Sequence, residues 1–286
     1  MANVVPPPRP VRRLPVIKTV SATYGFVFGN LRWFVRAALV PYVMSTLLFA
    51  LQVQIPAEES PGLALLLIAL GLIPYTLFAV SWHRLALLGP AAAVPPIVPP
   101  WRPQHSRFLG FFILVTLIGY FVVLPLGILV GGLVMASVEE VPTLALVLLV
   151  PCVTIAMFYL TLRLSFVFPA ISVDERYGLA ESWRHTAGQG MRLLGAMTLA
   201  ILPIALTIAA LFLIFAGAPL ETPPGLPAEV ATPGPSLAAA VVFQVLSAVL
   251  GYLLTAVMVS VMSFAFRACT GWVPAPRPSP PIRTGG

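Results

Sequence analysis

Residues 193–216 read LLGAMTLAILPIALTIAALFLIFA and contain no charged side chain. A helix that crosses the hydrocarbon core of a bilayer, roughly 30 Å thick, needs about 20 mostly apolar residues. Five further stretches meet this requirement, at residues 34–54, 62–82, 108–136, 144–164 and 237–266. None of the six carries a charge deep in its interior. The sequence therefore predicts six membrane-spanning helices.

The composition of the whole chain excludes the soluble classes of protein. Of its 286 residues 59% are hydrophobic and 9% are charged, and the mean hydropathy is +0.99. Soluble globular chains carry about 25% charged residues, so a soluble enzyme, a disordered tail protein and a coiled coil are all excluded. Because lipid offers the backbone no hydrogen-bond partner, the predicted fold class is all-α, a polytopic transmembrane bundle of six spans.

The charged residues alternate between the two sides of the predicted bundle. All 16 lysine and arginine residues fall in segments 1–36, 83–107, 163–192 and 267–286. The three intervening segments hold six of the nine acidic residues and no base. The positive-inside rule then places both termini in the cytoplasm. A single lysine and 31 prolines are typical of a GC-rich bacterial genome, so we expect a multi-pass protein of the bacterial inner (plasma) membrane.

Three parts follow one another along the chain. We expect a cytoplasmic tail rich in proline and arginine at 1–15, a membrane domain at 16–272 and a second such tail at 273–286. Two segments of the membrane domain, 16–29 and 177–187, predict short amphipathic helices lying in the interface. Their apolar residues recur at steps of three or four, at Val16, Val20, Tyr24, Val27, Tyr177, Ala180, Trp183 and Ala187.

The segment from Arg163 to Arg192 contains the candidate site. Arg163, Arg184 and Arg192 are expected to gather an anionic lipid headgroup, because guanidinium groups match phosphate oxygens. Pro169 is expected to turn the chain between the span and the amphipathic helix. In the alternative interpretation these arginines only fix the topology, and Arg184 pairs with an acid such as Glu181.

The same segment resembles a known family. The resemblance rests on Arg163-Leu164-Ser165-Phe166, Pro169-Ala170, Glu181-Ser182-Trp183-Arg184-His185-Thr186-Ala187-Gly188 and Arg192-Leu193. These residues are similar to the R-x-S, P-A, S-W-x-x-T-x-G, R-L pattern of a bacterial superfamily of six-span proteins. That superfamily includes the membrane domain of some glycerophosphoryl diester phosphodiesterases. The resemblance implies a six-helix inner-membrane protein, but not the esterase, whose soluble barrel has no counterpart in this chain.

The histidines and the cytoplasmic acids offer the only material for acid and base chemistry on a lipid phosphate. We expect them in cytoplasmic loops, at His83, His105, His185, Asp174, Glu175 and Glu181. No H-E-x-x-H, Walker or G-x-S-x-G spacing accompanies them. We therefore expect no enzyme activity, no cofactor and no metal site, with a lipid-modifying enzyme as the less favoured reading.

Transport is the main alternative. Coupled carriers place ionisable groups near the bilayer centre, whereas this chain offers neutral ones there, such as Tyr120, Gln244 and Tyr252. An uncoupled pathway for a neutral or amphiphilic solute stays open. The favoured function is that of a non-catalytic membrane module that organises lipids or partners. Its expected partners are the bilayer, anionic lipids and other membrane proteins or a second copy, and no nucleic acid.

Overall fold

The computed structural model describes residues 13–55, 60–91, 93, 95–136, 143–216 and 237–274. Within these ranges the chain forms nine helices and no strand, which confirms the all-α fold class. The helices are α1 (Val16–Gly29), α2 (Leu31–Gln54), α3 (Pro61–Leu88), α4 (Pro103–Ala136), α5 (Thr143–Leu164), α6 (Val167–Ser172), α7 (Leu179–His185), α8 (Gly190–Ala216) and α9 (Leu237–Thr270). Most of each predicted tail and the acidic pairs of the three intervening segments lie outside the described residues.

Six of the described helices, α2, α3, α4, α5, α8 and α9, are long and apolar enough to cross a membrane, as predicted. Their bounds follow the apolar stretches closely, but α3 continues to Leu88 instead of ending at residue 82. This extension forms because Trp82, His83 and Leu85 are buried inside the protein and do not face the headgroups. The helix ends at Gly89, whose φ of +75° suits a residue without a side chain.

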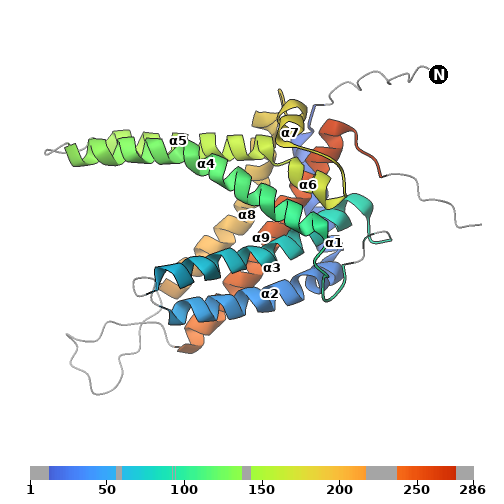
Figure 1. Ribbon diagram of the computed structural model, residues 1–286, viewed down its shortest axis with the longest axis horizontal. Coiled ribbons are helices and arrows are strands. Elements are labelled where there is room, and N and C mark those ends of the chain that lie inside the picture. The colour runs from blue at the N-terminus through green and yellow to red at the C-terminus, as the bar shows by residue number, and fades with distance from the viewer. Residues whose placement is uncertain are drawn as a thin grey trace, which may run out of the picture.

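The spans pack as three antiparallel pairs. Figure 1 shows α2 beside α3 and α4 beside α5, with the α8–α9 pair inclined to the α2–α3 pair. Helix α9 joins the α8–α9 pair to the α2–α3 pair, because it also packs against α1, α2 and α3, and the α4–α5 pair contacts α3 and α8. The pairs leave α1, α6 and α7 at one end of the bundle (Figure 1).

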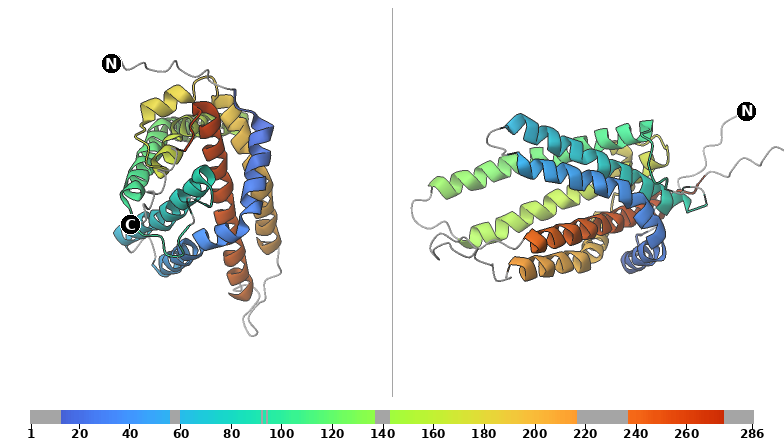
Figure 2. Two further views of the ribbon diagram at one scale, coloured as in Figure 1. Left: turned by 90° about the vertical axis from the view of Figure 1, so that its right-hand side faces the viewer. Right: turned by 90° about the horizontal axis from the view of Figure 1, so that it is seen from below.

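Helix α1 lies across that end and packs against α8 and α9 (Figure 2). Its predicted apolar face is confirmed, since Val27 is fully buried and Val16, Val20 and Tyr24 pack against the core. The Tyr24 hydroxyl donates to the carbonyl oxygen of Ala200 in α8 at 2.7 Å, and burial raises the pKa of Tyr24. The first predicted amphipathic helix therefore joins the bundle through specific contacts.

Trp82 lies at the centre of the packing near this end. Its indole N–H donates to the Ser260 hydroxyl at 2.9 Å, and its side chain is fully buried. The rings of Phe26, Phe34 and Phe78 have their centroids 5.4 to 5.9 Å from the Trp82 ring. One side chain of α3 thus joins α1, α2 and α9.

The segment between α5 and α8 differs from the expectation in one respect. Helix α6 was not predicted, and Pro169 lies inside it, so the expectation that Pro169 turns the chain was wrong. Proline is accepted there because the first turn of a helix needs no N–H from it. The chain turns instead after Ser172, where Asp174 adopts a φ of 65°. Helix α7 forms within the second predicted segment, but its buried residue is Ser182, whereas Ala180 and Trp183 are exposed, so these two apolar residues do not face the core.

Replacing Trp82 by alanine should destabilise the protein by roughly 3–5 kcal/mol, because the cavity left at the junction of four helices cannot close. Unfolding in mixed detergent micelles measures the change. Trp101→Ala is the matched control, since Trp101 is 45% exposed and its replacement should lower the free energy of unfolding only slightly. Equal losses in the two variants would contradict the central place of Trp82.

Candidate functional site

All described lysine and arginine residues lie at the end of the bundle that carries α1, α6 and α7 (Figure 1). The antiparallel order of the spans brings together the starts of α2, α4 and α8 and the ends of α3, α5 and α9. We call this the basic end. Its described bases are Arg13, Lys18, Arg32, Arg36, Arg84, Arg102, Arg107, Arg163, Arg176, Arg184, Arg192 and Arg267.

Helix α7 is fastened to the end of α5 by two hydroxyl groups. Ser182 Oγ donates to the Arg163 carbonyl oxygen at 2.8 Å and accepts the Phe166 N–H at 3.1 Å. Thr186 Oγ1 lies 3.1 Å from the same Arg163 oxygen. The last carbonyl groups of a helix have no partner within it, so these hydroxyls supply one. The serine and threonine of the S-W-x-x-T pattern therefore have a structural role here.

The Arg163 side chain completes this junction. Its Nη2 donates to the Trp183 carbonyl oxygen at 2.7 Å and its Nε to Thr186 Oγ1 at 3.3 Å. The guanidinium carbon lies 3.7 Å from the centroid of the Trp183 ring, which is a cation–π contact. Arg163 is thus held against α7 by the backbone, the hydroxyl and the ring.

The other two predicted arginines have different partners. Arg184 pairs with Glu181 at 3.4 Å, as the alternative interpretation expected, and its side chain stays 73% exposed. Arg192 Nη1 donates to the Leu14 carbonyl oxygen at 3.2 Å and so ties the chain before α1 to α8. Arg163 therefore contacts α7, Arg184 belongs to α7, and Arg192 bonds the segment before α1. Their sharing of one headgroup stays a prediction.

The ionisable groups of α7 are tuned by their surroundings. Hydrogen bonds from its own backbone N–H and from the Gly178 N–H, at 2.9 Å, lower the pKa of Glu181. Burial, followed by the nearby Glu181 charge, raises the pKa of Tyr177. The Tyr177 hydroxyl lies 2.7 Å from His185 Nδ1. Glu181 is therefore a carboxylate at neutral pH, positioned to hold Arg184.

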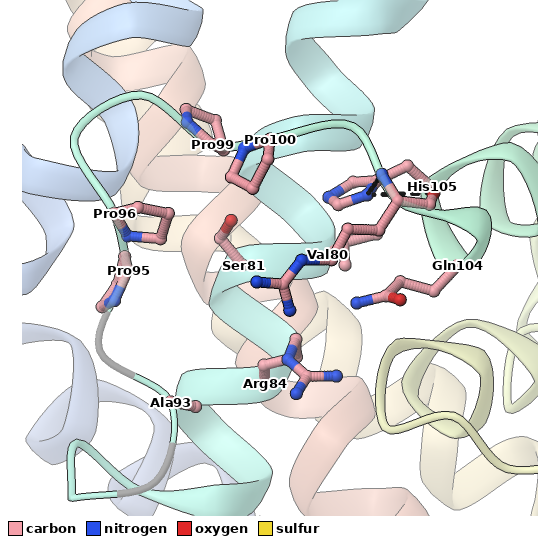
Figure 3. A pocket seen from close by; sticks show the side chains of 11 residues that line it. Val80, Ser81, Arg84, Ala93, Pro95, Pro96, Pro99, Pro100, Gln104 and His105 are labelled. Carbon is pink, nitrogen blue, oxygen red and sulfur yellow. Dashed lines mark hydrogen bonds between the residues drawn. The ribbon is translucent and has the colours of Figure 1, made fainter.

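A second basic site, which the sequence did not reveal, lies between α3 and α4. A cavity of about 190 Å³ opens between the end of α3, the proline-rich segment 95–100 and the start of α4 (Figure 3). Its polar lining comes from Ser81, Arg84, Arg102, Gln104 and His105, and we call it the arginine cavity. In Figure 3 the Gln104 side chain extends from α4 toward Arg84 on α3.

The hydrogen bonds around the arginine cavity leave donors available. Arg84 Nη1 donates to the Ser172 carbonyl oxygen at 2.8 Å and to Asp174 Oδ2 at 2.9 Å. No described residue bonds the guanidinium group of Arg102 or the side-chain amide of Gln104. Gln104 is nevertheless only 7% exposed. The Arg102 guanidinium group and the Gln104 amide therefore keep donors for a ligand in the cavity that accepts hydrogen bonds.

The histidines do not form the expected set in the loops. His83 lies within α3 and is buried, and its Nδ1 lies 2.8 Å from Ser263 Oγ. His105 lies in the first turn of α4. The expectation of loops was wrong for these two, because both helices extend beyond their apolar stretches, and His185 is the last residue of α7, within the predicted helix 177–187. Among the described residues no group of histidine, cysteine, aspartate or glutamate is arranged to hold a metal ion.

The arginine cavity was missed because its lining comes from two helices and the segment that joins them. The available signal was the pair of diproline sequences at 95–96 and 99–100, followed by Trp101 and Arg102. Prolines keep such a segment extended and prevent it from packing as a helix. Because the proline-rich segment 95–100 does not pack as a helix, it can leave open space beside Arg102.

The comparisons with known proteins give one match. Residues 137–272 match the model of a family described as a family of unknown function, DUF7544. The match covers a little less than half of the chain, from the segment before α5 to the end of α9. It includes α7 and its contacts with α5, but it carries no activity. No curated protein and no solved structure matches the chain.

The junction between α5 and α7 can be tested with two threonines. Thr186→Val should destabilise the protein by about 1–3 kcal/mol, because the hydroxyl shared with Arg163 is lost from a buried position. Thr207→Val is the matched control, since that exposed hydroxyl bonds only the Pro203 carbonyl of its own helix at 2.9 Å. Faster amide hydrogen exchange at 179–185 in Thr186→Val alone would support the junction, and unchanged exchange would contradict it.

Proposed function

We propose that this protein is a non-catalytic, multi-pass protein of the bacterial inner membrane that binds anionic lipid at its cytoplasmic surface and so organises lipids or partner proteins. The observation that carries the proposal is the arginine cavity at the basic end of the bundle. It combines two guanidinium groups with the Gln104 amide, which bonds no described residue. The expected partners are the bilayer and its anionic lipids, with other membrane proteins or a second copy beside them.

The chemistry of the cavity fits a phosphate group. Guanidinium groups donate in pairs to phosphate oxygens, and the Gln104 amide adds a neutral donor. The cavity also lies at the first turn of α4, where the helix dipole favours a negative charge. The Asp174 carboxylate offsets part of the Arg84 charge, whereas Arg102 pairs with no described carboxylate. A single phosphate diester of a lipid headgroup balances the Arg102 charge.

The predicted arginines of the loop belong to the same proposal. Arg184 is largely exposed and its pairing with Glu181 is long, so it is available to headgroups of the surrounding leaflet. Arg163 and Arg192 are already bonded to carbonyl groups of the protein. We therefore propose Arg184 as the member of this set that adds most to lipid binding, through attraction at the surface.

The orientation is testable with reporter fusions. Because all bases fall in four alternating segments, fusions after residues 60, 104, 140, 178, 226 and 286 should alternate in location, beginning outside. Alkaline phosphatase and green fluorescent protein activities in intact bacteria report the two sides. Two successive fusions on the same side would refute the proposed topology.

Lipid binding can be tested in nanodiscs that contain phosphatidylglycerol and phosphatidylethanolamine. Arg102→Gln should lower the retention of phosphatidylglycerol about fivefold, since a basic residue near an anionic surface contributes about 1 kcal/mol. Gln104→Leu, which changes no charge, should lower it as well. Native mass spectrometry of the released protein counts the bound lipids.

The control is Arg107→Gln, which removes the same charge from the next turn of α4 outside the cavity. If Arg107→Gln costs as much lipid as Arg102→Gln and Gln104→Leu costs none, the binding reflects surface charge alone. The proposed site in the cavity would then be wrong.

A further inference from the structure

A second hollow lies inside the membrane-spanning part of the bundle. It has a volume of about 400 Å³ and is bounded by α2, α3 and α9. Its polar lining consists of Ser45, Thr46, Tyr75, Gln244, Tyr252 and Thr255, and we call it the polar groove. The groove forms where α9 is inclined to α2 and α3 (Figure 1), since inclined helices leave space beside their crossing point.

Some of the hydroxyl groups in the polar groove are already bonded. Ser45 Oγ and the Tyr252 hydroxyl lie 2.8 Å apart and join α2 to α9. Thr46 and Thr255 each donate to the carbonyl oxygen four residues earlier in their own helices, at 2.9 Å. Hydroxyl oxygens accept as well as donate, so these groups keep acceptor capacity toward the groove.

Two further polar groups of the groove have no hydrogen-bond partner in the described part of the chain. Neither the Gln244 side-chain amide nor the Tyr75 hydroxyl bonds any described residue. Both belong to helices that cross the membrane, where lipid chains offer no hydrogen bond. Polar groups left unpaired in such surroundings are costly. The groove therefore favours an occupant that brings hydrogen-bonding atoms with it.

The rest of the lining restricts the kind of occupant. No charged residue lines the groove, and Phe49, Ala248 and Gly251 give it an apolar part. A methyl group added at Gly251 would meet nothing within 4 Å, so the groove is open at that point. The volume lies within the range of about 300–1,000 Å³ that is usual for small-molecule sites.

We propose that the polar groove binds one neutral amphiphile, with hydroxyl or ester oxygens at one end and a hydrocarbon chain at the other. The oxygens bond Gln244, Tyr75 and the Ser45–Tyr252 pair, and the chain lies along Phe49 and Ala248. This goes beyond the proposed headgroup site, because the groove is uncharged and lies within the spans, away from the arginine cavity. Lipids and other membrane-soluble alcohols or esters belong to this chemical class.

The test uses a monoacylglycerol that carries a diazirine on its acyl chain, in nanodiscs of phosphatidylcholine. Irradiation and peptide mass spectrometry should place most of the label on α2 and α9. An excess of unlabelled monoacylglycerol should remove the label, and an alkane of the same chain length should not. Because these discs contain no anionic lipid, the result does not depend on the headgroup site at the basic end.

Three variants decide whether the polar groups are responsible. Gln244→Leu combined with Tyr252→Phe should lower labelling at least fivefold, and Tyr75→Phe about threefold, because each removes a hydrogen bond to the probe. The matched control is Tyr120→Phe, since Tyr120 lies on α4 outside the groove and is 62% exposed. Its labelling should be unchanged. Tyr75→Phe removes a single oxygen atom, so it decides the matter if the double variant does not fold.

Three outcomes would overturn the proposal. Labelling that survives in Tyr75→Phe and in the double variant would show that the hydroxyl and amide groups do not bind the probe. Competition by the alkane would show a purely apolar site. Cross-links between α2 and α9 of two different chains would assign the groove to a second copy of the protein.

Discussion

The structure depends on the absence of hydrogen-bond partners for the backbone in hydrocarbon. Long helices satisfy that constraint within each span, and side chains facing outward are then free to be apolar. Phe121, Leu213 and Leu65 are 76%, 70% and 67% exposed, which a soluble protein would avoid and a lipid-facing surface requires. The same constraint moves charge to the ends of the helices. Among the described residues, the bases gather at the basic end, and uncharged polar groups line the polar groove.

At the basic end the same need for hydrogen-bond partners recurs, because the last carbonyl groups of each helix have none within the helix. Helix α7 supplies two hydroxyls to the end of α5, and Arg84 reaches the carbonyl oxygen at the end of α6. An arginine bonded in this way, such as Arg84, stabilises the fold. Arg102 and Gln104 differ from them, since no described residue satisfies their side chains. The distinction between occupied and available donors, more than the number of arginines, locates the proposed lipid site.

The two hollows of the bundle have complementary chemistry at different depths. The arginine cavity is cationic and lies beside the first turn of α4, so the proposed phosphate group would meet both guanidinium groups and a helix N-terminus. The polar groove is neutral and lies among α2, α3 and α9. If both proposals hold, the protein binds an anionic headgroup at its surface and a neutral amphiphile within its spans.

The sequence by itself determined the class of fold, the six spans and the collection of bases at one end, because hydropathy and charge act over a single segment. It also predicted α1 and α7 from their periodicity. The tertiary structure decided what those segments touch. His83 was expected in a loop, yet α3 continues past it because Ser263 of α9 and the surrounding core bury it. The lining of both hollows likewise comes from different helices, and no local pattern encodes the angle at which two helices cross.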